Sequence, residues 1–407
     1  MSILEVMSSK FSRFVFIILC ASLFSFSAFP ERFVFKFNEG DKYHAVTEVK
    51  EHIIQGDKFG QDDATAEILD KISFSVDKVE GEKALISGDF VVSTRNIHTG
   101  KVYEVNENYP SQYWLHTNGK MDIEPQYMMP VVRNVPIFPD RDLQPGDTWA
   151  YKGEEVHDFS HDDFPISVAR FPVTAAYEYA GIETFEGTDY HIINVEYTVY
   201  VQLQNDRAQG YTRISAHSSQ KLYWNMEAGR HYRSEDDFRF RWDFYDGSWV
   251  VFTGTAVGRI IDAELMDKEQ VADEIRESLK DVADTDVRVD DEGVTISLQN
   301  IQFAPDSSVL LESERAKIRR IAQILKNHTG RDILVSGHTA LAGTPEGRVQ
   351  LSLERARAVA DYLIRLGART DTEVMIRGYG ATRPLESNAT EEGMSKNRRV
   401  EITILEN

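Results

Sequence analysis

Alternating apolar and polar side chains dominate the first two thirds of the chain. Between residues 193 and 203 the odd positions are apolar and the even positions are largely polar. Residues 238–244 repeat the pattern with an aromatic side chain at every second position, and Asp246-Gly247 follows as a hairpin turn signal. A period of two is typical of strands with one buried face. Residues 28–260 are therefore predicted to be an all-β antiparallel domain, either a sandwich or a half-open barrel.

A proline-rich stretch interrupts this region near residues 130–150. Proline fixes φ and lacks an N–H donor, so the stretch must be an ordered connection or a sheet edge. Two β subdomains meeting there are an alternative to one domain. Phe138 and Trp149 could anchor a ligand, but Pro145-Gly146 is turn chemistry first, which favours a turn with both aromatic side chains buried.

Helical periodicity begins after residue 260. Val271, Ile275 and Leu279 recur every four residues, which predicts an amphipathic helix over residues 268–281. Residues 284–293 are polar and acidic, and they are predicted to form an irregular linker.

The helix and linker, residues 261–293, are expected to lead into a last domain, residues 294–407, in which strand and helix patterns alternate. Such alternation predicts a two-layer α/β domain. Within it, Thr344 and Pro345 predict the N-cap and first residue of a long helix, and Gly367 predicts its end.

The N-terminus has the pattern of a secretory signal peptide. Lys10 and Arg13 precede an apolar stretch, residues 14–24, which small residues follow. That stretch is about half of the ~20 residues that span a bilayer as a helix. Residues 1–27 are therefore predicted to be a signal peptide, which would place the mature protein in the periplasm, with or without an association with the outer membrane.

Cysteine content and charge exclude several classes of function. The single cysteine, Cys20, lies inside the predicted signal, so the mature chain would have no thiol for disulfides, thiolate catalysis or metal binding. Lipidation of Cys20 is the alternative, but Leu19 stands where lipoprotein signals have a small residue. A formal net charge of -21 disfavours nucleic acid, whose phosphates need a basic surface.

No pattern typical of catalysis is found. The sequence has no Gly-x-Ser-x-Gly elbow and no phosphate-binding loop, so the chain is predicted to be no enzyme and to need no cofactor. His157 and His161 have metal-ligand potential together with Asp158, Asp162 and Asp163. The segment is turn-like, which favours a solvated acidic loop, and no metal site is predicted.

The last domain carries a series of ordered motifs. They are Asn300-Ile-Gln-Phe303, Gly337-His-Thr339 with Gly343, Leu351-Ser352-Leu-Glu-Arg355-Ala356, Gly378-Tyr-Gly380 with Pro384, Asn388-Ala-Thr390-Glu-Glu-Gly393 and Asn397-Arg-Arg-Val-Glu401. In order and spacing they resemble the OmpA-like domain, which also occurs in peptidoglycan-associated lipoproteins and flagellar stator proteins. The resemblance covers about a quarter of the chain.

This resemblance implies non-covalent binding of the peptidoglycan stem peptide through its diamino acid, usually diaminopimelate. The ligand carries ammonium and carboxylate groups, which the family binds with an aspartate after the Gly-His-Thr run and an arginine fifteen residues later. The arginine is present as Arg355, whose guanidinium fork suits a carboxylate. Ala340 stands where the family has the aspartate.

Two further positions depart from the family pattern. Arg348 replaces an asparagine and Met394 replaces an arginine. A ligand ammonium left without its anion would cost ~3–5 kcal/mol, which is roughly two to four orders of magnitude in affinity. Glu346, on the first turn of the same helix, is a candidate replacement. Alternatively, the ligand is a stem peptide with another diamino acid, or an acidic group held by Arg348 and Arg355 together.

The positions that the resemblance assigns to peptidoglycan binding also have possible structural roles. They are Thr339, Gly343, Glu346, Arg348, Leu351, Ser352, Arg355, Asn397 and Arg398. Thr339 and Gly343 could shape only the loop, and Asn397 and Arg398 could tie the last helix to the sheet. Arg355 is the strongest candidate, since charge recognition is its role in the family.

Two functions of different classes follow. In the first, a non-enzymatic envelope protein binds peptidoglycan and connects it to an envelope partner held by the β domain. In the second, the last domain has lost peptidoglycan binding and is a scaffold for periplasmic protein partners. An outer-membrane barrel in the N-terminal region is a further alternative. Charges on both faces of its candidate strands, such as Lys50-Glu51-His52, favour a soluble β domain.

Overall fold

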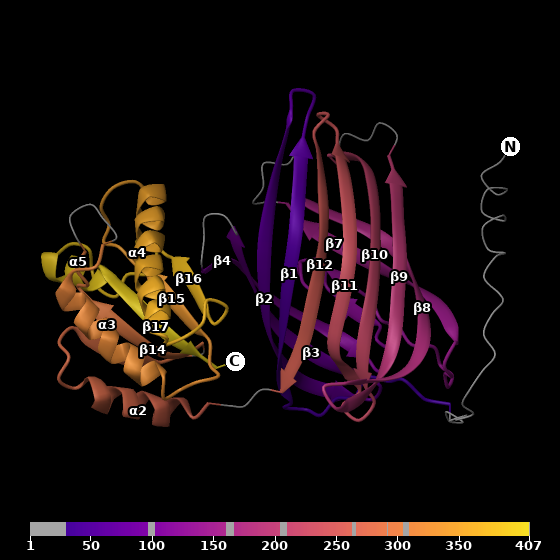
Figure 1. Ribbon diagram of the computed structural model, residues 1–407, viewed down its shortest axis with the longest axis horizontal. Coiled ribbons are helices and arrows are strands. Elements are labelled where there is room, and N and C mark those ends of the chain that lie inside the picture. Colours follow the sequence, from indigo (N-terminus) through magenta and orange to yellow (C-terminus); the bar gives the residue numbers. More distant parts are fainter. Residues whose placement is uncertain are drawn as a thin grey trace, which may run out of the picture.

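The computed structural model describes residues 30–96, 102–159, 167–203, 210–262, 266–290, 292–303 and 309–406. Figure 1 shows a tall β region, formed by β1–β12, beside a smaller unit that contains helices α2–α5. No helix within the described ranges has the length and apolar character needed to cross a bilayer.

The β region is one continuous antiparallel sheet within the described residues. Its strands are β1 (Lys42–Gly56), β2 (Gln61–Glu80), β3 (Lys83–Asn96), β4 (Tyr103–His116), β5 (Met121–Ile123), β6 (Val132–Arg133), β7 (Thr148–Asp158), β8 (Val168–Phe185), β9 (Thr188–Gln202), β10 (Tyr211–Asn225), β11 (Arg230–Phe244) and β12 (Trp249–Asp262). Pairing of β1 with both β2 and β12 joins two runs of neighbouring strands, which gives the order β5-β4-β3-β2-β1-β12-β11-β10-β9-β8-β7-β6.

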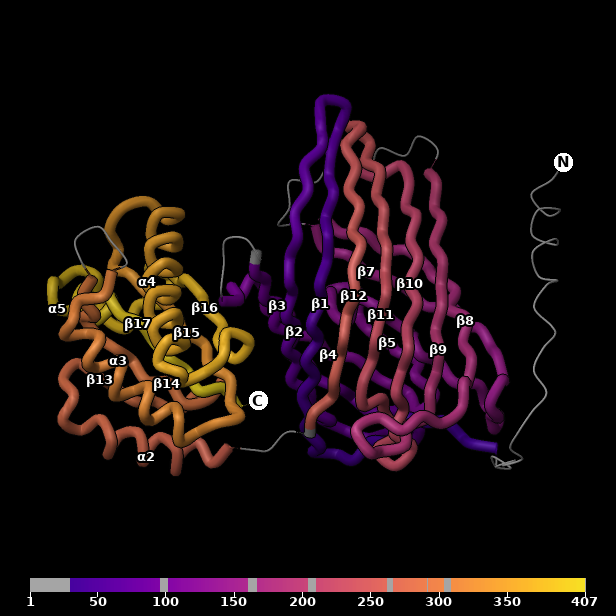
Figure 2. The backbone as a smooth tube through the Cα atoms, in the orientation of Figure 1, coloured from indigo at the N-terminus to yellow at the C-terminus, as the bar shows by residue number. Residues whose placement is uncertain are grey.

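This long sheet curls so that strands far apart in the order face each other (Figure 2). The Tyr109 hydroxyl of β4 lies 3.2 Å from a carboxylate oxygen of Asp158 in β7. Near the two ends of the strand order, the Met121 N–H donates to the Asn134 side chain over 2.7 Å. Strands of strong right-handed twist curl in this way when one face is apolar, because closure buries that face.

The alternating rows of the sequence face the inside of this curl. Val195 and Tyr197 of β9 and Trp242 of β11 belong to one large buried cluster. The turn at Asp246-Gly247 forms as predicted, with Gly247 at φ 91°, in the left-handed region that glycine adopts without strain. The β-rich N-terminal region is therefore confirmed.

The proline-rich connection is an ordered turn with its aromatic side chains packed inward. Phe138 is buried, and the half-buried Trp149 stacks on Tyr177 with ring centroids 5.3 Å apart. The indole N–H of Trp149 donates to the Ile137 carbonyl over 2.8 Å. Both rings thus serve the core of the β region, as the turn interpretation predicts.

The C-terminal unit combines helices with a five-stranded sheet in the described residues. Its elements are α2 (Lys268–Leu279), β13 (Thr285–Val289), β14 (Gly293–Gln299), α3 (Glu312–Leu325), β15 (Ile333–Gly337), α4 (Pro345–Arg365), β16 (Val374–Gly378), α5 (Glu391–Asn397) and β17 (Arg399–Leu405). The order is β13-β14-β17-β15-β16, in which only β15 and β16 run parallel. Helix and strand residues such as Ile318, Val359 and Ile402 share one core.

Local sequence signals set the ends of α4. The Thr344 hydroxyl accepts a hydrogen bond from the Gly347 N–H over 3.1 Å, and Pro345 is the first helical residue. Gly367 follows the last turn at φ 66°, which closes the helix in the left-handed conformation that glycine favours. Both ends agree with the sequence prediction.

The predicted linker, residues 284–293, is not irregular. Five of its residues form β13, which pairs with β14 so that Val287 lies opposite Ile296. Its charged residues suggested a solvated linker. In the structure, however, Arg288 forms an ion pair with Glu401. The pairing with β14 overrides weak local propensity.

A short parallel ladder joins the two parts of the molecule. Met375 and Ile376 of β16 pair with Tyr103 and Glu104 of β4. Leu334 and Met375 are buried there with Leu69 and Tyr103. Three ion pairs flank the ladder: Lys71–Asp332, Arg95–Asp371 and Arg357–Glu104.

Candidate functional site

Close contact between α4 and the sheet fixes where the helix side chains lie. A Cβ on Gly337 would stand 1.9 Å from the Ser352 carbonyl oxygen, so only glycine permits this approach. The buried Ser352 hydroxyl donates to the Val349 carbonyl over 2.7 Å and accepts from the Gly380 N–H over 2.9 Å. Ser352 thus holds the helix in register, and that register positions Arg355 one turn later.

The loop after β15 is tied down at its backbone. The Thr339 N–H donates to the Gly380 carbonyl over 2.8 Å, and the Leu341 N–H donates to the Asn388 side chain over 3.1 Å. Gly343 adopts φ 80° where the loop turns into α4. The Thr339 hydroxyl is buried and has no hydrogen-bond partner among the described residues, which is costly unless a ligand or water satisfies it.

Asn397 uses its whole side chain inside the domain. Its carbonyl oxygen accepts from the Leu385 and Glu386 N–H groups over 2.7 and 3.1 Å. Its amide nitrogen donates to the Glu386 carbonyl and to Asn388 over 2.8 and 3.0 Å. Since the side chain is fully buried, it orders the segment before α5 and leaves no donor directed toward solvent.

Arg355 is a half-buried cation without a partner carboxylate in the described part of the chain. Its guanidinium carbon lies 5.0 Å from the centre of the Phe303 ring, and its Nε has no hydrogen-bond partner among the described residues. Burial lowers the pKa of Arg355, and the positive charge of Arg398 adds to this effect. Arg355 is therefore poised to accept an anion.

Helix geometry sorts the other predicted residues of α4. Seven residues of an α-helix complete nearly two turns, so Arg348 lies within about 20° of Arg355 around the helix axis, and Leu351 lies about 40° to one side of Arg355. Glu346 precedes Arg355 by nine residues, which places it about 180° away on the other face. Arg348 donates to the Gly343 carbonyl over 2.6 Å. The arrangement brings the two arginines together and separates Glu346 from them.

The remaining positions around the arginines are neutral or neutralised. Arg398 donates to Glu391 over 2.7 Å. Ala340, in place of the family aspartate, is only 6% exposed. Met394 is partly buried in α5. We call Arg348, Arg355 and Arg398 the arginine face; only Arg398 has a carboxylate partner among the described residues.

A second charged cluster lies on the sheet and was missed by sequence reasoning. Glu401 accepts two hydrogen bonds from Arg288, over 2.7 and 2.8 Å, and one from Arg399 over 2.7 Å. A ring nitrogen of the buried His338 is 3.4 Å away. Burial alone would raise the pKa of Glu401, but Arg288 and His338 outweigh it and hold that pKa far below its usual range. Arg399 and Glu401 are two residues apart in one strand, so they point to the same face, and this spacing could have predicted the ion pair.

The candidate His/Asp cluster is only partly described. His157 belongs to β7 and not to a loop, and its ring nitrogen lies 2.7 Å from the buried Glu155 carboxylate. His161, Asp162 and Asp163 fall outside the described residues. In the ranges that the structure covers, no group of three potential metal-ligating side chains comes together.

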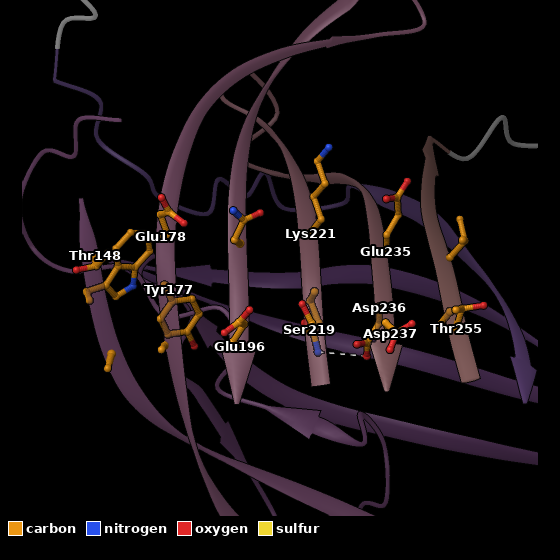
Figure 3. A pocket seen from close by; sticks show the side chains of 17 residues that line it. Thr148, Tyr177, Glu178, Glu196, Ser219, Lys221, Glu235, Asp236, Asp237 and Thr255 are labelled. Atoms are coloured by element: carbon orange, nitrogen blue, oxygen red, sulfur yellow. Dashed lines mark hydrogen bonds between the residues drawn. The ribbon is translucent and has the colours of Figure 1, made fainter. Parts of the chain in front are cut away.

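A cavity of about 1060 Å³ lies in the β region, and Figure 3 shows side chains that line it. Strand pairing aligns two rows of its lining residues, which cross β7–β12. The first row is Ala150, Ala176, Glu196, Ser219, Asp237 and Thr255. The second row is Thr148, Glu178, Asn194, Lys221, Glu235 and Val257. Asp236 lines the same cavity, and burial raises its pKa to about 6. This is a second, acidic candidate surface.

Comparison with known proteins identifies residues 302–398, the larger part of the C-terminal unit. Residues 302–398 match the OmpA family. They form an OmpA-family domain. The peptidoglycan-binding protein ArfA of Mycobacterium tuberculosis is 36% identical to this chain, in a match that covers 26% of this chain and 32% of ArfA. Outer membrane porin F of Pseudomonas aeruginosa is also 36% identical, over 26% of this chain and 30% of the relative.

A solved structure also resembles part of the chain. An outer membrane protein from Borrelia burgdorferi shares 35% sequence identity, covers 30% of this chain and 96% of its own, and has a TM-score of 0.26. The chain spans about a third of the length of the two curated relatives. The family assignment is therefore made for the OmpA-family domain, and it confirms the resemblance seen in the sequence motifs.

Proposed function

We propose that the OmpA-family domain binds the peptidoglycan stem peptide non-covalently and that Arg355 receives the carboxylate of its diamino acid. The observation that carries the proposal is the half-buried guanidinium group of Arg355, which has no carboxylate partner among the described residues. A half-buried cation without an anion among the residues that the structure describes costs stability. A binding role accounts for that cost.

Two further features of the OmpA-family domain suit a polar ligand. The Thr339 hydroxyl is buried and unpaired within the described residues, and it belongs to the loop that precedes α4. The Phe303 ring contacts the guanidinium group of Arg355 by a cation–π interaction. The guanidinium fork can donate to both carboxylate oxygens at once.

Docking of the two parts leaves the arginine face uncovered by the β region. Arg357, two residues after Arg355 and about 160° around the helix from it, is the α4 residue that pairs with Glu104 of β4. Figure 1 shows β16 next to the β region and α5 at the far end of the domain. The β region, with its acidic cavity, is thus free to hold an envelope partner while the OmpA-family domain binds the wall.

The full-length protein sedimented with purified sacculi tests the proposal. Loss of a hydrogen-bonded ionic contact removes about 1.5–3 kcal/mol, so Arg355→Ala should weaken binding roughly ten- to hundredfold. Arg365→Ala is the matched control, because Arg365 is an exposed arginine of the same helix; it should bind like the wild type. Equal binding of both variants would contradict the role of Arg355.

One observation favours a second function. Ala340 removes the family's anion, so the domain could have kept only its fold, as a scaffold for periplasmic proteins. In that case the wild type itself would not sediment with sacculi. Cross-linking in intact cells would then recover protein partners of the domain in place of wall fragments.

A further inference from the structure

The arginine face offers no anion to a ligand ammonium within the described residues. Glu391 is bonded to Arg398, and Glu401 is bonded to Arg288 and Arg399. Glu346, the remaining candidate, lies on the other face of α4 from Arg355. An ammonium bound beside Arg355 would therefore be desolvated near like charge.

Neutral groups stand where the family has its aspartate. Ala340 is buried, and the next side chain, Leu341, is apolar and 60% exposed. The unpaired Thr339 hydroxyl can donate to or accept from an amide. A hydroxyl beside an exposed apolar side chain suits an acylated amine better than a free one.

Peptidoglycan offers both chemical forms. The side-chain amine of the stem-peptide diamino acid is either free and positively charged, or joined as a neutral amide to a neighbouring stem peptide. The carboxylate beside it is present in both forms, so Arg355 has the same partner in each.

We infer that this domain binds the diamino acid whether its side-chain amine is free or acylated, and thus accepts cross-linked stem peptides. The inference rests on the proposed function and adds the ligand class. An aspartate at position 340 would bind a free ammonium by a charge-assisted hydrogen bond, whereas Ala340 makes no such distinction.

The test compares native diaminopimelate-containing sacculi with sacculi whose free amines have been acetylated with acetic anhydride. The wild-type full-length protein should bind acetylated sacculi at least as well as native sacculi. Ala340→Asp should prefer native sacculi by roughly tenfold or more. Ala340→Asn is the matched neutral control and should show no preference.

Each alternative result is decisive. Wild-type binding that falls upon acetylation overturns the inference and leaves the proposed function standing. Failure of the wild type to bind either preparation overturns the proposed function and the inference together. If Ala340→Asp folds, as judged by circular dichroism, yet shows no preference for native sacculi, position 340 does not face the amine and the inference is overturned. If it does not fold, the wild-type ratio decides alone.

Discussion

Two charged clusters of the C-terminal unit differ in whether a carboxylate neutralises their arginines. In the Glu401 cluster, Arg288, Arg399 and His338 surround one carboxylate, and the Arg399 side chain is only 3% exposed. On the arginine face, Arg355 is half-buried and has no carboxylate among the described residues. The two clusters are supplied by neighbouring segments of one small domain.

The difference separates architecture from recognition. Removing either partner from a buried, hydrogen-bonded ion pair strands the other, so the Glu401 cluster stabilises one arrangement of strands. Arg355 has a cation–π contact with Phe303 but no carboxylate among the described residues, so a ligand can provide the anion. Internal neutralisation therefore distinguishes these clusters better than their residue types, which are almost the same.

The largest expected effect comes from opening the closed cluster. Glu401→Gln keeps the side-chain shape but leaves Arg399 unpaired beneath the surface, which should lower the free energy of unfolding by about 3–5 kcal/mol. Helical circular dichroism during urea unfolding measures it, since the described helices all lie in this part of the chain. Glu391→Gln, which breaks an exposed pair with Arg398, is the control and should cost about 0–1 kcal/mol. Equal losses in both variants would contradict the distinction between the clusters.

Asn397 should give the next largest loss. Asn397→Ala leaves the Leu385 and Glu386 N–H groups without their acceptor, at a cost of about 1–3 kcal/mol for a buried group. The same urea experiment measures the loss. Affinity for sacculi, measured on folded protein, should change far less than in Arg355→Ala. A large drop in affinity with normal stability would instead show that Asn397 contacts the ligand.

The pH dependence of stability should have opposite signs in the two parts of the molecule. Glu401 has a lowered pKa, so its contribution is fully present above its ordinary value of 4.5 and is lost as pH falls below that value. Burial raises the pKa of Asp70 in β2 from 3.8 to about 7, and Glu51 adds to the shift. Its ionisation therefore destabilises the β region progressively as pH rises from about 4 to about 7.

Tryptophan fluorescence measures the β region separately, because all five tryptophans lie before residue 260. Asp70→Asn should flatten the loss of stability between pH 4 and pH 7 that the wild type shows. The helical signal of the OmpA-family domain should be unaffected by this variant. If Asp70→Asn had the same pH profile as the wild type, ionisation of Asp70 would not be the cause of the loss of stability.

The smallest expected effect is the stability change in Arg355→Met. Removal of an unpaired, half-buried charge should leave the unfolding free energy unchanged or raise it by about 1 kcal/mol at most, even though binding to sacculi is lost. Thermal unfolding of the variant and of the wild type measures the difference in stability. A clear destabilisation would show that Arg355 has an internal partner after all.

Local signals predicted much of the last domain. Thr344, Pro345 and Gly367 located α4 because capping depends on adjacent residues. β13 escaped prediction because a five-residue strand with charged side chains depends on its partner, β14. The ladder between β4 and β16 joins residues far apart in the chain, and no local pattern specifies it.

The candidate site was predictable to a similar degree. The sequence motifs made Arg355 and its neighbours in α4 candidates, and the helix fixes the directions of their side chains relative to one another. They could not show that Ser352 and Asn397 are consumed by internal hydrogen bonds, or that Glu346 lies on the far face of α4. Hydrogen-bond partners contributed by distant loops decide those roles.

The pairing of β16 with β4 has a consequence for work on the C-terminal part alone. A fragment without the β region would leave the outer edge of β16 unpaired and would expose Leu334 and Met375, which are buried in the whole protein. A bare strand edge beside apolar side chains is a template for self-association. Oligomers formed by an excised fragment would thus report the missing neighbour, and not the quaternary structure of the whole protein.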